Sequence, residues 1–169
     1  MSIQNTQDLS SRKLRALIIE DNEHMRALLR RLLQRISIAS MEYQDGTESL
    51  AAVKTHKPDF ILTDYSMEPM DGITFVRTLR HMEDEHIRKT PVIMITGHAK
   101  REAIETARDA GVNEILVKPV TEGGLQSRIR EAVLRPRPWV NTPTYCGPCR
   151  RRRDDPNYSG PERRKPTGG

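Results

Sequence analysis

The sequence predicts an α/β domain built on a doubly wound, five-stranded parallel sheet with helices on both faces. Short apolar runs, typical of strands buried on both faces, alternate with stretches in which apolar residues recur at helical spacing. This alternation favours a parallel sheet, because each helix returns the chain to the start of the next strand. In addition, polar residues follow four of the runs at once, and the ligand sites of such sheets lie at the carboxyl ends of the strands.

The first half of the alternation contains two expected strands and two expected helices. Residues 14–19 form a mostly apolar run that ends at a pair of carboxylates. Apolar residues then recur at helical spacing with arginines between them: Met25, Leu28, Leu29, Leu32 and Leu33. Residues 37–43 indicate a weaker strand, and the turn signal Asp45-Gly46 precedes a short helix that ends near Lys57.

The second half repeats the pattern with three more strands, at residues 60–63, 92–95 and 115–117. Three helices follow these strands, marked by apolar residues at helical spacing: Ile73, Val76 and Leu79; Ala103, Ile104, Ala107 and Ala110; and Leu125, Ile129 and Val133. Gly72 precedes the first of these helices, and Gly111 is expected to end the second as its C-cap.

Composition divides the chain into three parts. We expect a flexible N-terminus over residues 1–12, a folded domain over residues 13–134 and a disordered tail over residues 135–169, which is rich in Pro, Gly and Arg. The net charge of +5 is uneven, because the tail carries nine Lys and Arg against three Asp and Glu, and the rest carries nineteen against twenty. A near-neutral body with a basic tail is therefore the organisation to explain.

Composition also argues against several classes of protein. No apolar run approaches the roughly 20 residues of a membrane-spanning helix, and the N-terminus lacks the apolar segment of a secretory signal. We therefore expect a cytoplasmic protein. Its two cysteines, Cys146 and Cys149, do not make a disulfide framework in a reducing compartment, and a zinc site would need two further ligands.

The residues that could carry chemistry stand at the carboxyl ends of four expected strands: Glu20 and Asp21, Asp64, Thr96, and Lys118. On one rim of a sheet, three carboxylates would repel one another and raise one another's pKa. A divalent cation relieves that repulsion, and hard oxygen ligands with open water positions suit Mg²⁺.

The remaining groups suit a phosphoryl group better than a sugar or a hydride. Lys118 can neutralise phosphoryl oxygens, Thr96 can donate a hydrogen bond, and Asp64 can attack phosphorus to form an acyl phosphate. Taken singly, each residue has a plainer interpretation: Glu-Asp after a strand can be only helix N-terminal charge, and Lys-Pro only a turn. Their occurrence in this order at successive strand ends favours the functional interpretation.

This constellation resembles the receiver domain of bacterial two-component response regulators of the single-domain, chemotaxis-regulator-like kind, over about residues 13–134. Four stretches carry the resemblance: LIIED at residues 17–21, LTDYSMEPMDG at residues 62–72, MITGHA at residues 94–99 and ILVKP at residues 115–119. The resemblance implies a flavodoxin-like receiver fold that accepts a phosphoryl group from a histidine kinase or a phosphotransfer protein.

The resemblance also assigns roles to single residues. Asp64 would be the phospho-acceptor, with Thr96 and Lys118 in contact with the phosphoryl group. Mg²⁺ would be bound by Asp21 directly and by Glu20 through water. Asp64 and the main-chain carbonyl of Ser66 would complete the protein ligands.

The chain departs from the pattern of the receiver family at three places. Glu20 stands where Asp is commoner, but the side chain is still a carboxylate. The turn reads Glu68-Pro69, where the family more often has Pro first. Ile115 occupies the position at which many members carry a switch Tyr or Phe, so an aromatic side chain that reports phosphorylation is absent.

The tail contains an internal repeat. Tyr145-Cys-Gly-Pro-Cys-Arg-Arg151 returns as Tyr158-Ser-Gly-Pro-Glu-Arg-Arg164, so the repeat keeps Tyr, Gly-Pro and Arg-Arg but not the thiols. We interpret it as a short linear motif for an unidentified protein partner, because arginine pairs offer bidentate contacts to carboxylate or phosphate. The plainer alternative is a solubilising basic tail. Nucleic acid is not an expected partner, since no DNA-binding domain follows the receiver.

Two functions are compatible with these features. The first is a response regulator that accepts a phosphoryl group on Asp64 and signals through protein–protein interaction. The alternative is an interaction protein whose basic tail binds a protein or nucleic acid, with phosphorylation secondary. We do not expect an enzyme, because an Asp-dependent phosphohydrolase usually needs a second carboxylate just after its nucleophile, where Ser66 stands.

Overall fold

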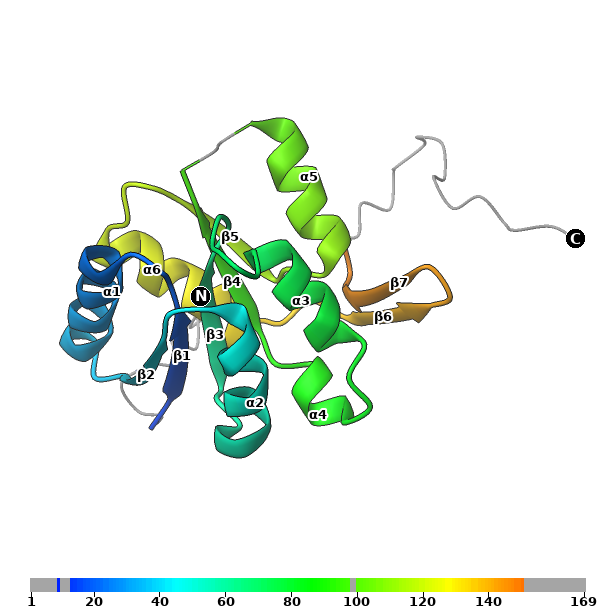
Figure 1. The fold of residues 1–169 in the computed structure, drawn as a ribbon, viewed down its shortest axis with the longest axis horizontal. Helices are drawn as coiled ribbons and strands as arrows, with labels where there is room; N and C mark the ends of the chain where they lie inside the picture. Colours follow the sequence, from blue (N-terminus) through cyan, green and yellow to red (C-terminus); the bar gives the residue numbers. More distant parts are fainter. Residues whose placement is uncertain (1–8, 10–12, 98–99, 151–169) are drawn as a thin grey trace, which may run out of the picture.

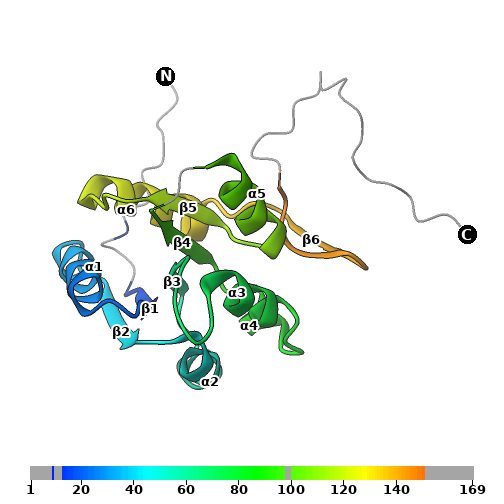
Figure 2. The same cartoon turned by 45° about the horizontal axis from the view of Figure 1, so that its top comes forward.

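The computed structural model describes residue 9, residues 13–97 and residues 100–150 of the chain (Figure 1). These residues form a central sheet covered on both faces by helices, followed by a small hairpin (Figures 1 and 2). The second copy of the repeated motif and most of the expected flexible N-terminus lie outside the described residues.

The central sheet has five parallel strands in the order β2-β1-β3-β4-β5, which confirms the predicted fold class. The strands are β1 (Arg15–Ile19), β2 (Ala39–Tyr43), β3 (Phe60–Asp64), β4 (Val92–Thr96) and β5 (Glu114–Val117). All five residues of β3 and of β4 are buried, because these strands lie inside the sheet and are covered on both faces. All five expected strands are present, with bounds shifted by one or two residues.

The helices cover the sheet in two layers. They are α1 (Glu23–Arg35), α2 (Gly46–His56), α3 (Gly72–Arg80), α4 (Glu85–Arg88), α5 (Arg101–Ala110) and α6 (Glu122–Ile129), and one π-helical turn (Arg130–Leu134) extends α6. Side chains of α1 and α6 pack on one face of the sheet, and side chains of α2, α3 and α5 pack on the other. Alternate residues of each strand supply these two cores; Ile18, for example, belongs to the first and Leu17 to the second.

Two expectations for residues 1–134 need correction. The short helix α4 was not expected, because only Ile87 among its four residues is apolar and buried, and one apolar residue gives no periodic signal. The N-terminus is not free throughout: Leu9 is 1% exposed and belongs to the core of α1 and α6. An isolated leucine in a polar segment is buried here because the core offers it an apolar contact.

The expectation of a disordered tail is wrong for its first part. β6 (Trp139–Thr142) and β7 (Tyr145–Pro148) pair as an antiparallel hairpin beside α5 at the edge of the domain (Figure 1). Arg137 secures the start of the hairpin, because its guanidinium donates hydrogen bonds to the carbonyl oxygens of Val112, Asn113 and Cys149. The hairpin was missed because charged and glycine contacts hold it, so no alternating apolar pattern is needed.

Arg80, at the end of α3, is the buried polar centre below this hairpin. The side chain is 1% exposed, and its guanidinium donates four hydrogen bonds of 2.6–3.0 Å, to the carbonyl oxygens of Arg88, Thr90 and Gly111 and to Asn113 Oδ1. Its carbon Cζ also lies 5.2 Å from the ring centroid of Trp139. Burial lowers the pKa of this guanidinium to about 10, so Arg80 is still protonated at neutral pH.

We predict that Arg80→Met lowers the free energy of unfolding by about 3 kcal/mol or more, because several buried carbonyl oxygens lose their donors. Urea denaturation of the full chain measures the change. Arg77→Met is the matched control, since Arg77 lies on the same helix but is exposed. Equal losses in the two variants, or no loss in Arg80→Met, would contradict this role for Arg80.

Candidate functional site

The order of the strands brings the predicted polar residues to one rim of the sheet. Asp64 is the last residue of β3 and Thr96 the last of β4, while Glu20 follows β1 and Lys118 follows β5. Because β3 pairs with both β1 and β4, Asp64 lies at the centre of this rim. Glu20, Asp64 and Thr96 are all buried, at 1%, 6% and 3% exposure.

The two oxygens of Asp64 have different surroundings. Oδ2 accepts a hydrogen bond of 2.9 Å from the main-chain N–H of Ser66. Oδ1 forms an ion pair with Lys118, whose Nζ lies 2.7 Å away, and it has no hydrogen-bond donor among the described residues. One oxygen of Asp64 is therefore fixed by the backbone, and the other faces a cation.

Glu20 is the second buried carboxylate of the rim. Its Oε1 accepts a hydrogen bond of 3.2 Å from the Asn22 N–H. Its Oε2 lies 3.9 Å from Lys118 Nζ and has no hydrogen-bond partner in the described ranges. Burial, and next the charge of Asp64, raise the pKa of Glu20 to about 7. The single positive charge of Lys118 therefore balances only part of the negative charge that Glu20 and Asp64 can carry.

These residues fit a divalent cation of the Mg²⁺ type. The fit rests on two buried carboxylate oxygens for which the described residues supply no hydrogen-bond donor, Glu20 Oε2 and Asp64 Oδ1. Within the described ranges, no three His, Cys, Asp or Glu side chains are arranged to hold a metal ion by themselves. Mg²⁺ tolerates such an open site, because it commonly keeps several waters and binds proteins through one or two carboxylates.

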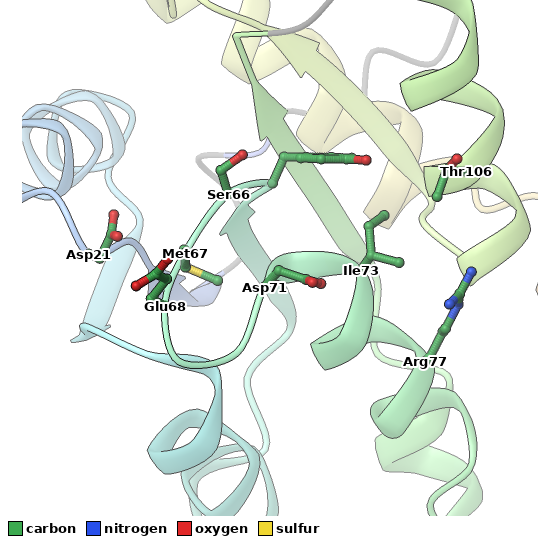
Figure 3. A pocket seen from close by; sticks show the side chains of 9 residues that line it. Asp21, Ser66, Met67, Glu68, Asp71, Ile73, Arg77 and Thr106 are labelled. Carbon is green, nitrogen blue, oxygen red and sulfur yellow. The ribbon is translucent and has the colours of Figure 1, made fainter.

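An open pocket of about 630 Å³ extends from this rim along the β3–α3 loop (Figure 3). Its lining residues are Asp21, Tyr65, Ser66, Met67, Glu68, Asp71, Ile73, Arg77 and Thr106. Figure 3 shows Asp21 and Glu68 toward α1, and Arg77 and Thr106 toward α5. Asp21 is exposed, so it can reach a ligand that approaches through solvent.

The start of α3 fits closely against the main chain of Asp64. A Cβ atom at Gly72 would lie 2.2 Å from the Asp64 carbonyl oxygen, so only glycine fits there. Asp71 then caps α3 by accepting a hydrogen bond of 2.7 Å from the Thr74 N–H. The Asp-Gly pair of the sequence therefore fixes the loop that carries Ser66 beside Asp64.

The structure brings together most of the predicted site residues. Glu20, Asp64 and Lys118 are linked by the contacts above, and the Lys118 N–H donates a hydrogen bond of 2.9 Å to the Thr96 carbonyl, which joins the ends of β4 and β5. Ile115 is half-buried and packs against the core of α2, α3 and α5. Asp21 and the Ser66 side chain stay exposed at the pocket.

Sequence reasoning missed Arg26 and Arg80. Arg26 Nη1 donates a hydrogen bond of 2.6 Å to the Glu20 carbonyl and so ties α1 to the rim. Arg80 falls seven residues after Ile73, on the apolar face of α3, and a charged residue on such a face was the available signal.

Comparison with known proteins agrees with this geometry. The family model described as response regulator receiver domain matches residues 16–130. The chemotaxis protein CheY-3 of Vibrio cholerae is 36% identical over 120 residues, which cover 70% of this chain and 91% of that protein.

Solved structures share the fold. The chemotaxis protein CheY4 of Vibrio cholerae superposes with a TM-score of 0.66 at 25% identity, over 72% of this chain and 99% of that one. The receiver domain of a sensor histidine kinase from Pseudomonas aeruginosa, solved with a magnesium ion in its active-site cleft, has a TM-score of 0.66 at 24% identity, over 72% and 98% of the two chains. With the family model matched over most of the sheet and its helices, the chain belongs to the response regulator receiver domains of two-component signalling.

Proposed function

We propose that the protein is a cytoplasmic response regulator that accepts a phosphoryl group on Asp64 from a histidine kinase or a phosphotransfer protein. One observation carries the proposal: Asp64 Oδ1, at the centre of the rim, lies 2.7 Å from Lys118 Nζ and has no hydrogen-bond donor within the part of the chain that the structure describes. An oxygen that faces a cation and is not held by the main chain is suited to accept a phosphoryl group. The protein then acts as an acceptor that signals by binding partners, and not as an enzyme.

In the transfer step, a carboxylate oxygen of Asp64 bonds to phosphorus while the bond from phosphorus to the donor's imidazole nitrogen breaks. That nitrogen keeps the bonding electron pair, and the product is an acyl phosphate. Lys118 holds its positive charge beside the acceptor, and the Ser66 N–H keeps the carboxylate in one orientation. Thr96, at the end of the neighbouring strand, would donate its hydroxyl to a phosphoryl oxygen.

We further propose that Glu20, Asp21, Asp64 and the carbonyl of Ser66 hold Mg²⁺. When bound, the ion would neutralise charge on the phosphoryl oxygens. Support comes from the excess of buried carboxylate over cation at the rim and from the raised pKa of Glu20. Asp21 would supply the ligand on the solvent side, since it is the exposed carboxylate of the set.

The alternative, an interaction protein that works through a free basic tail, has less support. Two arginines in the described part of the tail are engaged with the domain: Arg137 through carbonyl oxygens, and Arg150 through an ion pair of 3.1 Å with Asp109. Cations used in this way are less available for nucleic acid or for an acidic surface. We therefore propose a protein, and not nucleic acid, as the partner of the tail.

Asp64→Asn is predicted to abolish phosphoryl uptake without unfolding the domain, because it removes the acceptor and also relieves repulsion with Glu20. Intact-protein mass spectrometry after incubation with phosphoramidate and Mg²⁺ measures uptake. Glu83→Gln, an exposed carboxyl-to-amide change far from the rim, should take up phosphoryl as the unmodified chain does. Uptake that persists in Asp64→Asn would refute the assignment.

Asp21→Asn is predicted to weaken Mg²⁺ binding about tenfold or more, since one charged ligand is lost. Amide shifts of residues 64–66 during a Mg²⁺ titration report the affinity independently of phosphorylation. Glu83→Gln again serves as the control. An unchanged titration curve for Asp21→Asn would remove this residue from the site.

With Ile115 in the usual aromatic position, the response is predicted to depend on Thr96 and on residues 97–110. Beryllofluoride, a phosphoryl mimic, should cause amide shifts that concentrate in residues 97–110, and Thr96→Val should suppress them. Ile115→Val should leave them in place, because the change removes one methylene from a half-buried side chain. Shifts confined to a remote surface would contradict this coupling.

A further inference from the structure

The described part of the first copy of the repeated motif, residues 145–150, lies on the end of α5. We name its contact surface the α5 seat and define it by Arg108, Asp109 and Gly111. Arg150, from the motif, forms an ion pair of 3.1 Å with Asp109 Oδ1 and lies over the Tyr145 ring, with its Cζ 4.2 Å from the centroid. The Tyr145 hydroxyl lies 3.4 Å from the Arg108 carbonyl oxygen.

Two glycines, Gly111 after α5 and Gly147 in β7, allow the main chain of the hairpin to lie against the end of α5. A Cβ atom at Gly147 would lie 2.9 Å from Gly111 Cα and 2.7 Å from the Tyr145 hydroxyl oxygen. At Gly111, whose φ of 95° is itself unfavourable for other residues, a Cβ atom would lie 2.9 Å from the Cys146 carbonyl oxygen. Pro148 completes the motif, because its carbonyl accepts a hydrogen bond of 2.6 Å from the Tyr145 hydroxyl.

The residues that make these contacts are the ones that the repeat keeps. Tyr145, Gly147, Pro148 and Arg150 return as Tyr158, Gly160, Pro161 and Arg163. Cys146 and Cys149, which do not return, contribute main-chain groups that any residue supplies. The Cys146 carbonyl faces Gly111, and Cys149 donates its N–H to Pro138 and accepts from Arg137.

We propose that the α5 seat binds either copy of the motif, so that Tyr158–Arg164 of the same chain exchanges with Tyr145–Arg151. The α5 seat recognises the pattern Tyr-x-Gly-Pro-x-Arg, and both copies contain this pattern. The proposal does not rest on phosphoryl transfer to Asp64.

The chain length allows the exchange and favours the first copy. The second copy begins thirteen residues after the first, so the loop after β6 would grow from two residues to fifteen if the second copy paired there. The entropy of closing a loop rises slowly with its length, and this difference disfavours the second copy by on the order of tenfold. The first copy is therefore docked in the unmodified chain, and the second takes the seat when the first is weakened.

Full-chain tyrosine variants test the exchange, with the amide shift of Gly111 and the fluorescence of Trp139, the single tryptophan, as reports of docking. In Tyr145→Ala, the second copy should keep the seat occupied, and both signals should stay closer to the unmodified chain than to Tyr145→Ala/Tyr158→Ala. Tyr158→Ala alone should change neither signal. Equal signals in Tyr145→Ala and the double variant, or a double variant that still docks, would overturn the proposal.

Charge reversal tests whether Asp109 pairs with the first arginine of the second copy. In Tyr145→Ala/Asp109→Arg, docking of the second copy should be lost, and adding Arg163→Asp should restore it. Arg164→Asp is the matched control, because it makes the same charge change one residue later and should restore nothing. Failure of Arg163→Asp to restore docking, or equal recovery with Arg164→Asp, would overturn the assignment.

Dilution tests whether the exchange stays within one chain. The Gly111 shift of Tyr145→Ala should be unchanged across a tenfold range of protein concentration, because an intramolecular equilibrium does not depend on concentration. A shift that moves toward the double variant on dilution would show that a second molecule supplies the motif, and would overturn exchange within the chain.

Discussion

Two carboxyl groups, Glu20 and Asp64, are buried near each other at the ends of neighbouring strands, and one ammonium group, Lys118, faces both. This imbalance of charge is the constraint on which the site depends. Burial makes the repulsion costly, as the raised pKa of Glu20 indicates, and a bound cation or a transferred group changes that cost directly. The fold creates the imbalance, because the strand order β1-β3-β4-β5 brings the ends of four separate segments together.

At the ends of α3 and α5, a second set of polar contacts holds the hairpin. Arg80 ties the end of α3 to Gly111, and Gly111 in turn receives the hairpin at Gly147. The helix α5 thus has its start close behind Thr96, at the rim, and its end at the hairpin. A change at Thr96 that moved α5 would reach the hairpin through a single rigid helix, without a longer series of contacts.

The sequence predicted the parts of the molecule that follow from local pattern. The five strands, the Gly111 cap and the meeting of Glu20, Asp64 and Lys118 follow from apolar runs and from the rule that parallel strands end on one edge. Two features depend on how loops fold: the exposure of Asp21 and the hydrogen bond from the Ser66 N–H to Asp64. The periodic pattern of apolar residues does not predict the conformation of a loop. A loop of this kind is fixed by single contacts, such as the one at Gly72.

The hairpin was beyond prediction for a related reason. The side chain of Trp139 faces the guanidinium of Arg80, Arg137 donates to the carbonyl of Val112, and Gly147 lies against Gly111. In each of these three contacts, the partner is at least 25 residues away in the sequence. Composition alone favoured disorder, because Pro, Gly and Arg are rarely enough to build a core. The repeat was the one local signal that these residues mattered.

Asp64 is the proposed phospho-acceptor, and its identity can be tested chemically. Borohydride reduces an acyl phosphate to the alcohol, so it converts a phosphorylated aspartate to homoserine and marks the acceptor in the unmodified chain. Peptide mass spectrometry after phosphoryl transfer and borohydride treatment should find homoserine at position 64. Homoserine in place of a different aspartate would contradict this assignment. So would the absence of homoserine in a sample whose intact mass shows that the protein was phosphorylated.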